Sequence, residues 1–329
     1  MGSLDQGARN VVTTCLAVKR GERVVLVTDG STRDIGDAIE RHARAATDAV
    51  ERFDLDDLGA RPLKEVPKAL AEAASRADVT VWAAASVKGE LPARMEFRKY
   101  IRGRARHGHM PGVTRVLMEE GMNADYDAVE ALTLKVFERA KRARTARVTN
   151  PNGTDFSVEF KSDWKWLADT GKFHRRGDWG NLPAGETYTA PYRMNGRVVT
   201  NLLGDFFSEK YGELVPPVRF DVRDSWVDLE SIAGGTPEVV AEFRAYLQTG
   251  PNSARAGEFA LGTNLGLTRL VGNLLQDEKI VGVHVAFGNP YPEETGAPWH
   301  EKTHVDCVIL ETDVWLDGER VQQAGRYVL

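Results

Sequence analysis

The chain has 329 residues, of which 42% are hydrophobic and 28% are charged, and its formal net charge is −5. This composition is typical of a globular protein with enough apolar material for a core, and the length predicts two domains or one large one. Because no apolar run reaches about 18 residues, a membrane-spanning helix is excluded, and the net negative charge argues against a nucleic-acid partner.

The N-terminus and the cysteines narrow the class of protein further. The first six residues lack the basic start and apolar stretch of a secretory signal, so we expect a cytoplasmic location. Cys15 and Cys307 are the two cysteines and form at most one disulfide. A disulfide scaffold and a thiolate zinc finger are therefore excluded.

Strand-like and helix-like patterns alternate over the first 145 residues. We expect strands at 23–28 and 79–85, and helices at 35–50, 65–76 and 125–144. Such alternation is typical of parallel βαβ units, so residues 1–145 are predicted to form an N-terminal α/β domain. The turn at 29–33 does not match a dinucleotide fingerprint and the chain has no P-loop, so no nucleotide cofactor is predicted.

The pattern changes after Arg147. An Asn-Gly turn at 152–153 separates two strands within 148–158. Short strands follow at 196–199, 218–222 and 225–229, with one helix at 237–247. Residues 146–329 are therefore predicted to form a mostly antiparallel α+β domain, and the fold class of the whole chain is α/β plus α+β.

The segment 304–310 is apolar and β-prone, which predicts a strand that carries His304 and Asp306. Side chains alternate between the two faces of a strand, so these two residues point the same way. An imidazole and a carboxylate that project together from a buried strand suit a divalent metal.

Two further apolar segments each carry one polar residue. His284 interrupts the predicted strand at 281–288, and Glu258 lies in the strand-like segment 256–262. A buried carboxylate without a partner is costly, and a metal is a natural partner for it. Glu186, in 181–191, is either a fourth such carboxylate or an ordinary loop acid. The other histidines are interpreted as a pocket-lining residue, His300, and as surface residues, His42, His107, His109 and His174.

On these residues the chain resembles the aminopeptidase T-like metallopeptidases. That family has an acid between an Asn-Leu-Pro segment and an aromatic-Thr-Ala-Pro segment, then a Gly-Glu pair and an Asp-Glu pair. A histidine strand, a tyrosine seven residues later and a His-x-Asp follow. The residues of this chain that match the pattern, in order, are Glu186, Glu258, Asp277-Glu278, His284, Tyr291, His304 and Asp306.

The resemblance implies a metal-dependent hydrolase, an aminopeptidase or related amidohydrolase, which cleaves an amide next to a free amine of a peptide or small amide. It implies a homodimer and two divalent metals per chain (Zn, Co, Mn or Mg) that activate a water. The expected ligands are Glu186, Glu258, His284, His304 and Asp306, with Glu278 as a further ligand or supporting acid. Glu258 and Tyr291 are the expected catalytic residues, and Tyr291 would donate a hydrogen bond to the oxyanion.

An alternative function uses the same fold. The chain is shorter than peptidases of the family, and it also resembles dihydroxypyridine dioxygenase at His284, His304 and Asp306. Two histidines and one carboxylate are typical of mononuclear Fe(II) oxygenases. The presence of Glu186 and Glu258 favours the two-metal hydrolase over this ring-cleaving dioxygenase. A binding protein with a degraded site is the third alternative, and the intact polar positions argue against it.

Overall fold

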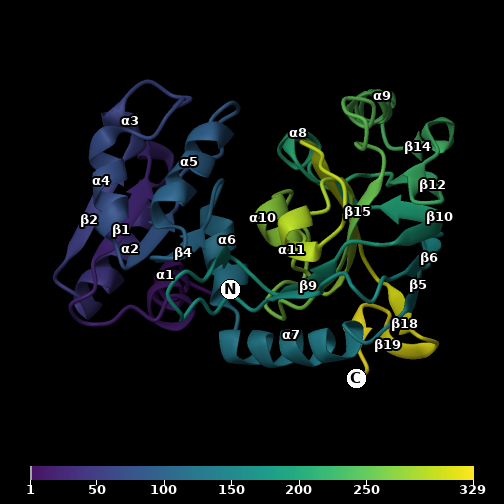
Figure 1. The fold of residues 1–329 in the computed structure, drawn as a ribbon, viewed down its shortest axis with the longest axis horizontal. Helices are drawn as coiled ribbons and strands as arrows, with labels where there is room; N and C mark the ends of the chain where they lie inside the picture. Colours follow the sequence, from purple (N-terminus) through teal and green to yellow (C-terminus); the bar gives the residue numbers. More distant parts are fainter. Residues whose placement is uncertain (1) are drawn as a thin grey trace. The chain divides into compact units, whose positions relative to one another are not determined.

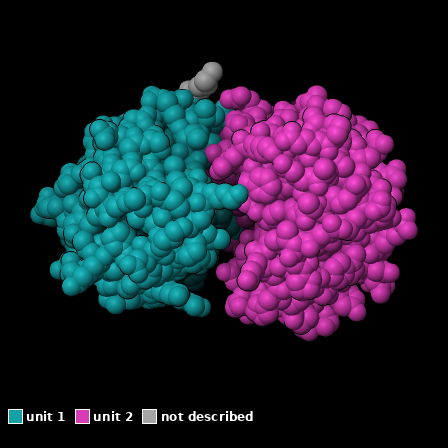
Figure 2. Space-filling model, turned by 90° about the horizontal axis from the view of Figure 1, so that it is seen from above, with its two compact units in different colours: residues 1–130, 169–184 teal, residues 131–168, 185–329 magenta. Residues whose placement is uncertain are grey.

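The computed structural model describes residues 2–329, and the chain forms two compact units (Figures 1 and 2). Unit 1 consists of Met1–Glu130 and Asp169–Ala184, and unit 2 of Ala131–Ala168 and Gly185–Leu329. The domain boundary predicted after residue 145 stays a prediction, because the chain changes unit at three other places. Among the described residues, none of the helices combines the length and apolar character needed to span a membrane.

Unit 1 is built on a parallel five-stranded sheet of order β2-β1-β3-β4-β8. Val25 and Val27, in the strand Val24–Thr28, belong to a hydrophobic cluster that includes residues of the helices Lys68–Arg76 and Leu91–Ile101. The strands are β1 (Val24–Thr28), β2 (Val50–Asp54), β3 (Val79–Trp82), β4 (Arg106–His109) and β8 (Trp179–Asn181). The main helices are α1 (Leu4–Arg9), α2 (Arg33–Ala46), α3 (Leu55–Leu58), α4 (Lys68–Arg76), α5 (Leu91–Ile101) and α6 (Arg115–Glu119). The predicted parallel α/β architecture is confirmed.

Two of the predicted helices extend beyond the C-terminal ends of the observed ones. The helix expected at 35–50 ends at Ala46, since Val50 begins β2 and pairs with Val24 of β1. The helix expected at 125–144 is α7 (Tyr126–Ala140). In both cases apolar residues beyond the end of the helix continue the helical spacing, although they belong to the next strand or turn.

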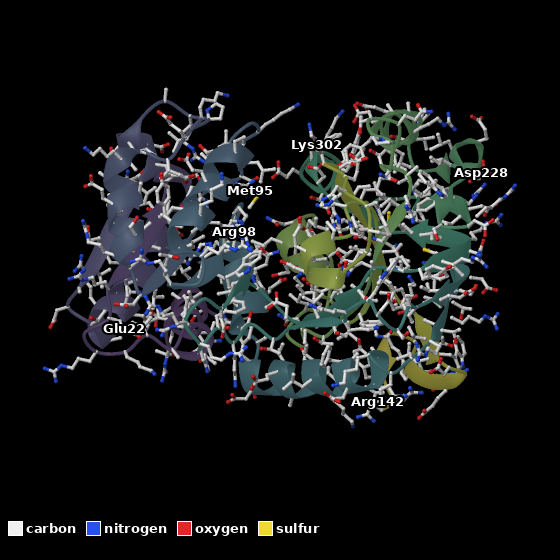
Figure 3. The ribbon with its side chains drawn as sticks, in the orientation of Figure 1. Glu22, Met95, Arg98, Arg142, Asp228 and Lys302 are labelled. Atoms are coloured by element: carbon white, nitrogen blue, oxygen red, sulfur yellow. The ribbon has the colours of Figure 1, made fainter. Side chains whose placement is uncertain are left out.

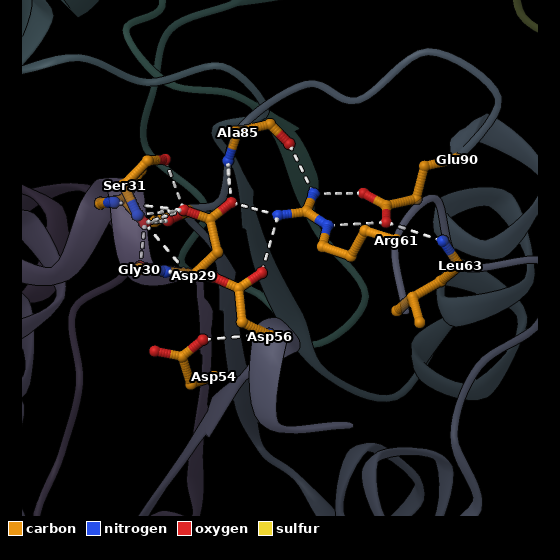
Figure 4. A network of polar contacts seen from close by, with 11 residues as sticks. Asp29, Gly30, Ser31, Asp54, Asp56, Arg61, Leu63, Ala85 and Glu90 are labelled. Atoms are coloured by element: carbon orange, nitrogen blue, oxygen red, sulfur yellow. Dashed lines mark hydrogen bonds and ion pairs between the residues drawn. The ribbon is translucent and has the colours of Figure 1, made fainter. Parts of the chain in front are cut away.

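A buried ion-pair network organises the loops that follow the strands of unit 1 (Figure 4). Asp29 directly follows β1, and its carboxylate accepts hydrogen bonds from the backbone N–H groups of Ser31 and Thr32. Arg61 donates to Asp29, to Glu90 at 2.5 Å and to the carbonyl oxygen of Ala85 at 3.1 Å. Each buried charge therefore has an opposite partner, which is the condition under which such burial is tolerated.

The side chains of β4 are polar and nevertheless enclosed. His107 is buried, and its Nδ1 lies 2.8 Å from the hydroxyl oxygen of Thr80 on the neighbouring strand. Its Nε2 lies 3.1 Å from Nδ1 of His109, which is half-buried. The surface location predicted for these two histidines is wrong, because β4 lies between β3 and β8 within the sheet.

Charged side chains contact two strands of this sheet, β4 and β8. Glu22, labelled in Figure 3, accepts a hydrogen bond at 2.5 Å from Arg106, the first residue of β4. Arg98, also labelled there, places its guanidinium carbon 3.2 Å from the centroid of the Trp179 ring in β8. A cation over an aromatic face is favourable.

Unit 2 contains two antiparallel sheets. The first has the order β13-β12-β10-β6-β5-β18-β19-β20, with β14 beside β12. Its strands are β5 (Thr145–Thr149), β6 (Asp155–Glu159), β10 (Arg193–Thr200), β12 (Val218–Arg223), β13 (Trp226–Val227), β14 (Ala233–Gly234), β18 (Asp313–Leu316), β19 (Glu319–Gln323) and β20 (Arg326–Tyr327). The hairpin predicted within 148–158 is confirmed as the antiparallel pair β5 and β6.

The second sheet of unit 2 has the order β11-β17-β16-β15-β9-β7. Its strands are β7 (Leu167–Asp169), β9 (Glu186–Thr189), β11 (Leu202–Leu203), β15 (Ala256–Gly262), β16 (Gly282–Gly288) and β17 (His304–Ile309). The helices of the unit are the second part of α7, α8 (Phe206–Tyr211), α9 (Pro237–Tyr246), α10 (Leu274–Asp277) and α11 (Pro292–Thr295). The predicted α+β class of this half is confirmed.

One hydrophobic core lies between these two sheets. It contains Phe156 and Phe220 from the first sheet together with Phe259, Val285 and Cys307 from the second. Only one face of the second sheet is used in this way. Because side chains alternate along a strand, the other face is free to carry different chemistry.

Candidate metal centre

The antiparallel register of the second sheet brings the predicted site residues onto one face. Glu258, Ala286 and Asp306 lie side by side on β15, β16 and β17. Their sequence neighbours point into the core. His284 precedes Ala286 by two residues and His304 precedes Asp306 by two, so both rings project from the same face as the acids.

Several positions between the acids and imidazoles on this face are occupied by small residues. Ala260 is the register partner of His284, and Ala286 lies between the two acids. Gly288 pairs with His304, and its φ of +115° lies in the region that favours glycine. A Cβ at Gly288 would come within 2.2 Å of the carbonyl oxygen of Thr303. Small side chains therefore leave the space above the sheet to the acids and imidazoles.

The two imidazoles share the carboxylate of Glu258. Its Oε1 lies 3.1 Å from Nε2 of His284, and its Oε2 lies 3.6 Å from Nε2 of His304. The same His304 nitrogen lies 3.4 Å from Oδ1 of Asp306. On its other side, Nδ1 of His304 donates to the carbonyl oxygen of Asn289 at 2.9 Å. This bond orients the ring with Nε2 toward the acids, the arrangement seen in metal-binding histidines.

Glu186 completes the group from β9. It is the register partner of Gly262, and only 6% of the residue is exposed, so it is a buried strand residue rather than a loop acid. Its Oε2 lies 3.4 Å from Nε2 of His284 and has no hydrogen-bond partner among the described residues. A buried carboxylate oxygen without a hydrogen-bond partner needs another source of positive charge, and a bound metal ion would supply it.

Lys279 is a member of the site that the sequence analysis missed. Its Nζ lies 2.5 Å from Oε1 of Glu186 and 2.6 Å from Oε1 of Glu278, and its side chain is 2% exposed. In the Asp-Glu-Lys run at 277–279 the family pattern includes only the two acids. The sequence signal for this lysine is its position between the acid pair and the apolar histidine strand.

The donor atoms fit a divalent metal. Two groups of three residues have ligand atoms within 4.8 Å of one another: Glu186, Glu258 and His284, and then Glu278, His284 and Asp306. Carboxylate oxygen and imidazole nitrogen are the ligands that Zn, Mn, Co and Fe accept in proteins. Together with the unpaired oxygen of Glu186, this chemistry supports a metal at these residues.

The electrostatics of the site point to the same conclusion. Burial lowers the pKa of His284, but Glu258, Glu186 and Asp306 raise it more, to about 9. Burial also opposes the charged form of His304, yet Asp306 and Glu258 raise the pKa of His304 to about 10. Burial raises the pKa of Glu278 to about 7, against the lowering effect of Lys279. The acids thus attract positive charge strongly.

Tyr291 and His300 occupy different surroundings. The ring centroid of Tyr291 lies 4.8 Å from that of His304, and its φ of +51° is unusual for a residue with a Cβ. Burial first, and then Glu258 and Asp306, raise the pKa of Tyr291 well above 10, so its hydroxyl keeps its proton. His300 has a side chain that is 76% exposed and pairs loosely with Glu293 at 3.9 Å.

Comparison with known proteins decides the family. The sequence matches the thermophilic metalloprotease (M29) family over residues 133–306, which is more than half of the chain. The chain belongs to this family. It is an enzyme of a metallo-aminopeptidase family, and the predicted resemblance is confirmed. The matched segment of this M29 chain contains every residue of the candidate metal centre.

Two solved structures are similar over nearly the whole M29 chain. AmpT from Thermus thermophilus has a TM-score of 0.73 and 18% identity, with 99% of each chain covered. The 2,5-dihydroxypyridine dioxygenase from Pseudomonas putida KT2440 has a TM-score of 0.69 and 17% identity, with 99% of this chain and 96% of that chain covered. At such identities the likeness shows a shared fold. Comparison of the sequence with curated proteins gave no match.

Proposed function

We propose that this M29 chain is a metal-dependent aminopeptidase or related amidohydrolase that cleaves an amide next to a free amine. The observation that carries the proposal is the position of Glu258. Its two carboxylate oxygens face His284 and His304 on the face of the sheet that points away from the main core. Family membership supplies the reaction class, and the buried acids and imidazoles supply a place for it.

The proposed metal ligands come from four neighbouring strands. Each is a carboxylate or imidazole on the same face of the sheet, and Glu278 supports them from the turn after α10. The ligands are Glu186, Glu258, His284, His304 and Asp306. A bound divalent ion supplies Lewis acidity, which polarises a carbonyl and lowers the pKa of a water. Zn, Mn, Co and Mg all remain compatible with this family and donor set.

Two residues of the chain are proposed to act directly on the reacting atoms. Glu258 is proposed to accept a proton from the attacking water, because its carboxylate lies between the imidazoles of His284 and His304, next to the proposed ion. Tyr291 keeps its hydroxyl proton and is proposed to donate it as a hydrogen bond to the oxyanion of the tetrahedral intermediate. The choice between a peptide and a small amide as substrate, and the homodimer, stay proposals carried over from the resemblance.

A second candidate function is a mononuclear Fe(II) ring-cleaving dioxygenase. The observation that favours it is the convergence of His284, His304 and Asp306, two histidines and one carboxylate. The fold likeness to the 2,5-dihydroxypyridine dioxygenase is compatible with it. Glu186 and Glu258 add two carboxylates beyond that set of three, which favours hydrolysis.

The two candidates are separated by metal analysis combined with two assays on protein purified without added metal. We expect Zn, Mn or Co, together with hydrolysis of aminoacyl p-nitroanilides. Oxygen consumption in the presence of 2,5-dihydroxypyridine is expected to be absent. Bound iron with oxygen consumption, and no amide hydrolysis, would overturn the hydrolase and establish the dioxygenase.

A further inference from the structure

Lys279 is a buried cation inside the candidate metal centre. Its side chain is 2% exposed, and its Nζ contacts one oxygen of Glu186 at 2.5 Å and one oxygen of Glu278 at 2.6 Å. A buried ammonium group is tolerated only when it is paired and hydrogen-bonded. The two short contacts meet that condition, so the ammonium group of Lys279 is held between two carboxylates.

The position of Lys279 relates directly to the two groups of ligand atoms. One group contains Glu186 and the other contains Glu278, and both contain His284. Lys279 therefore engages one carboxylate of each group. The carboxylate of Glu258 lies between the imidazoles of His284 and His304, and Asp306 adjoins His304.

The charges of the centre are consistent with one dication beside the lysine. The four acids carry up to four negative charges, and Lys279 with one dication supplies three positive ones. The single remaining negative charge suits the α-ammonium group of an aminopeptidase substrate. A second dication at Glu186 and Glu278 would compete with the ammonium group of Lys279 for the same carboxylate oxygens. The dication and this ammonium group would also repel each other strongly, because both are positively charged and would lie close together.

We propose that the ammonium group of Lys279 takes the place of a second metal ion, so that the centre binds one divalent ion. That ion is held by Glu258, His284, His304 and Asp306, together with Oε2 of Glu186, which faces His284 and is not the oxygen that Lys279 contacts. The proposal rests on the metal centre of the proposed function. It replaces the expectation of two ions per chain by one ion and one lysine.

The test counts ions on the full-length chain. Metal-free protein is incubated with excess Mn²⁺ or Zn²⁺ and passed through a desalting column, and the retained metal per chain is measured. The variants are Lys279→Met, which removes the charge, and Lys279→Arg, which keeps it. Lys210→Met is the matched control, because Lys210 also contacts two glutamates, Glu238 and Glu242, but with a side chain that is 42% exposed.

We expect one ion per chain in the wild type, the arginine variant and the control, and two ions in Lys279→Met. Two ions in the wild type would overturn this inference and leave the proposed hydrolase intact. One ion in folded Lys279→Met would also overturn it, because the lysine would then not occupy a metal position. No retained ion in the wild type would overturn both this inference and the metal-dependent function, so the two failures are distinguishable.

Discussion

Nε2 of His284 lies 3.1 Å from Oε1 of Glu258, across the neighbouring strands β16 and β15. In the metal-free chain this contact is a hydrogen bond from a protonated ring, because the surrounding acids raise the pKa of His284 to about 9. The pKa of His304 is raised to about 10 by Asp306 and Glu258. A metal ion requires neutral imidazoles, so it has to displace both protons.

Metal binding is therefore expected to release protons. At pH 7.5 both rings of the metal-free chain carry a proton, and we expect about two protons released per ion bound. The affinity for the metal ion should rise with pH up to about pH 9–10, where both histidines are deprotonated even without a metal. Calorimetry in buffers of different ionisation enthalpy measures the proton count. His300→Ala, which changes an exposed ring, should release the same number, and release of no protons by the wild type would contradict the assignment.

Replacement of Tyr291 by phenylalanine removes the proposed donor to the oxyanion. We expect kcat for aminoacyl p-nitroanilides to fall by about 10²–10³-fold, the usual cost of losing one such donor. The amount of bound metal should not change, because the hydroxyl is not a proposed ligand. Tyr100→Phe, a change in unit 1 at a tyrosine whose hydroxyl donates to Glu96, is the control. An unchanged kcat in Tyr291→Phe would remove Tyr291 from the mechanism.

The candidate site was predicted well where side-chain alternation decides the geometry. His304 and Asp306 share a face because they are two residues apart in one strand, and the apolar runs around His284 and Glu258 identify the neighbouring strands. Glu186 was less certain, since its segment reads as a loop. Its position in β9 depends on pairing with β15, which is a long-range contact that no local pattern encodes.

Other features escaped prediction for physical reasons. The β4 segment, Arg106–His109, has no apolar side chain, and it is a central strand only because β3 and β8 pair on its two sides. β8 is formed by Trp179–Asn181, which lie far along the chain from β4. Its place in the parallel sheet therefore could not be inferred from the local sequence pattern. Lys279 reads as a surface charge, and its burial depends on two carboxylates brought to it by the fold.

The Arg61 network of unit 1 is expected to be important for stability. Arg61→Leu leaves Asp29 and Glu90 buried without their cation, and we expect the free energy of unfolding to fall by about 3–5 kcal/mol. Arg44→Leu is the control, because it breaks an exposed helix pair with Glu40 that is worth about 0.3–0.5 kcal/mol. Urea denaturation measures both changes. Equal losses in the two variants would show that the buried network is no stronger than a surface pair.

His107 should make the chain less stable in acid. Burial and then Arg98 lower the pKa of His107 to about 3, whereas the unfolded chain takes up a proton near pH 6.5. Between these values the unfolded state binds more protons, so stability falls as the pH falls, by up to about 1.4 kcal/mol per pH unit. His107→Gln should show a shallower loss between pH 6 and pH 4 in urea titrations. Identical slopes in variant and wild type would contradict the buried, neutral state of this ring.

The most direct test of the account is metal-dependent hydrolysis by the wild type and by Glu258→Gln. Protein stripped of metal by a chelator is assayed on leucine p-nitroanilide while Zn²⁺, Mn²⁺ or Co²⁺ is added back, and circular dichroism checks that the variant is folded. We predict no hydrolysis without metal, recovery in the wild type on addition of metal, and at least a 100-fold lower rate in Glu258→Gln, about 2.7 kcal/mol of barrier. Equal hydrolysis by the folded variant, or hydrolysis by the wild type that is independent of metal, would contradict a metal-dependent hydrolase centred on Glu258.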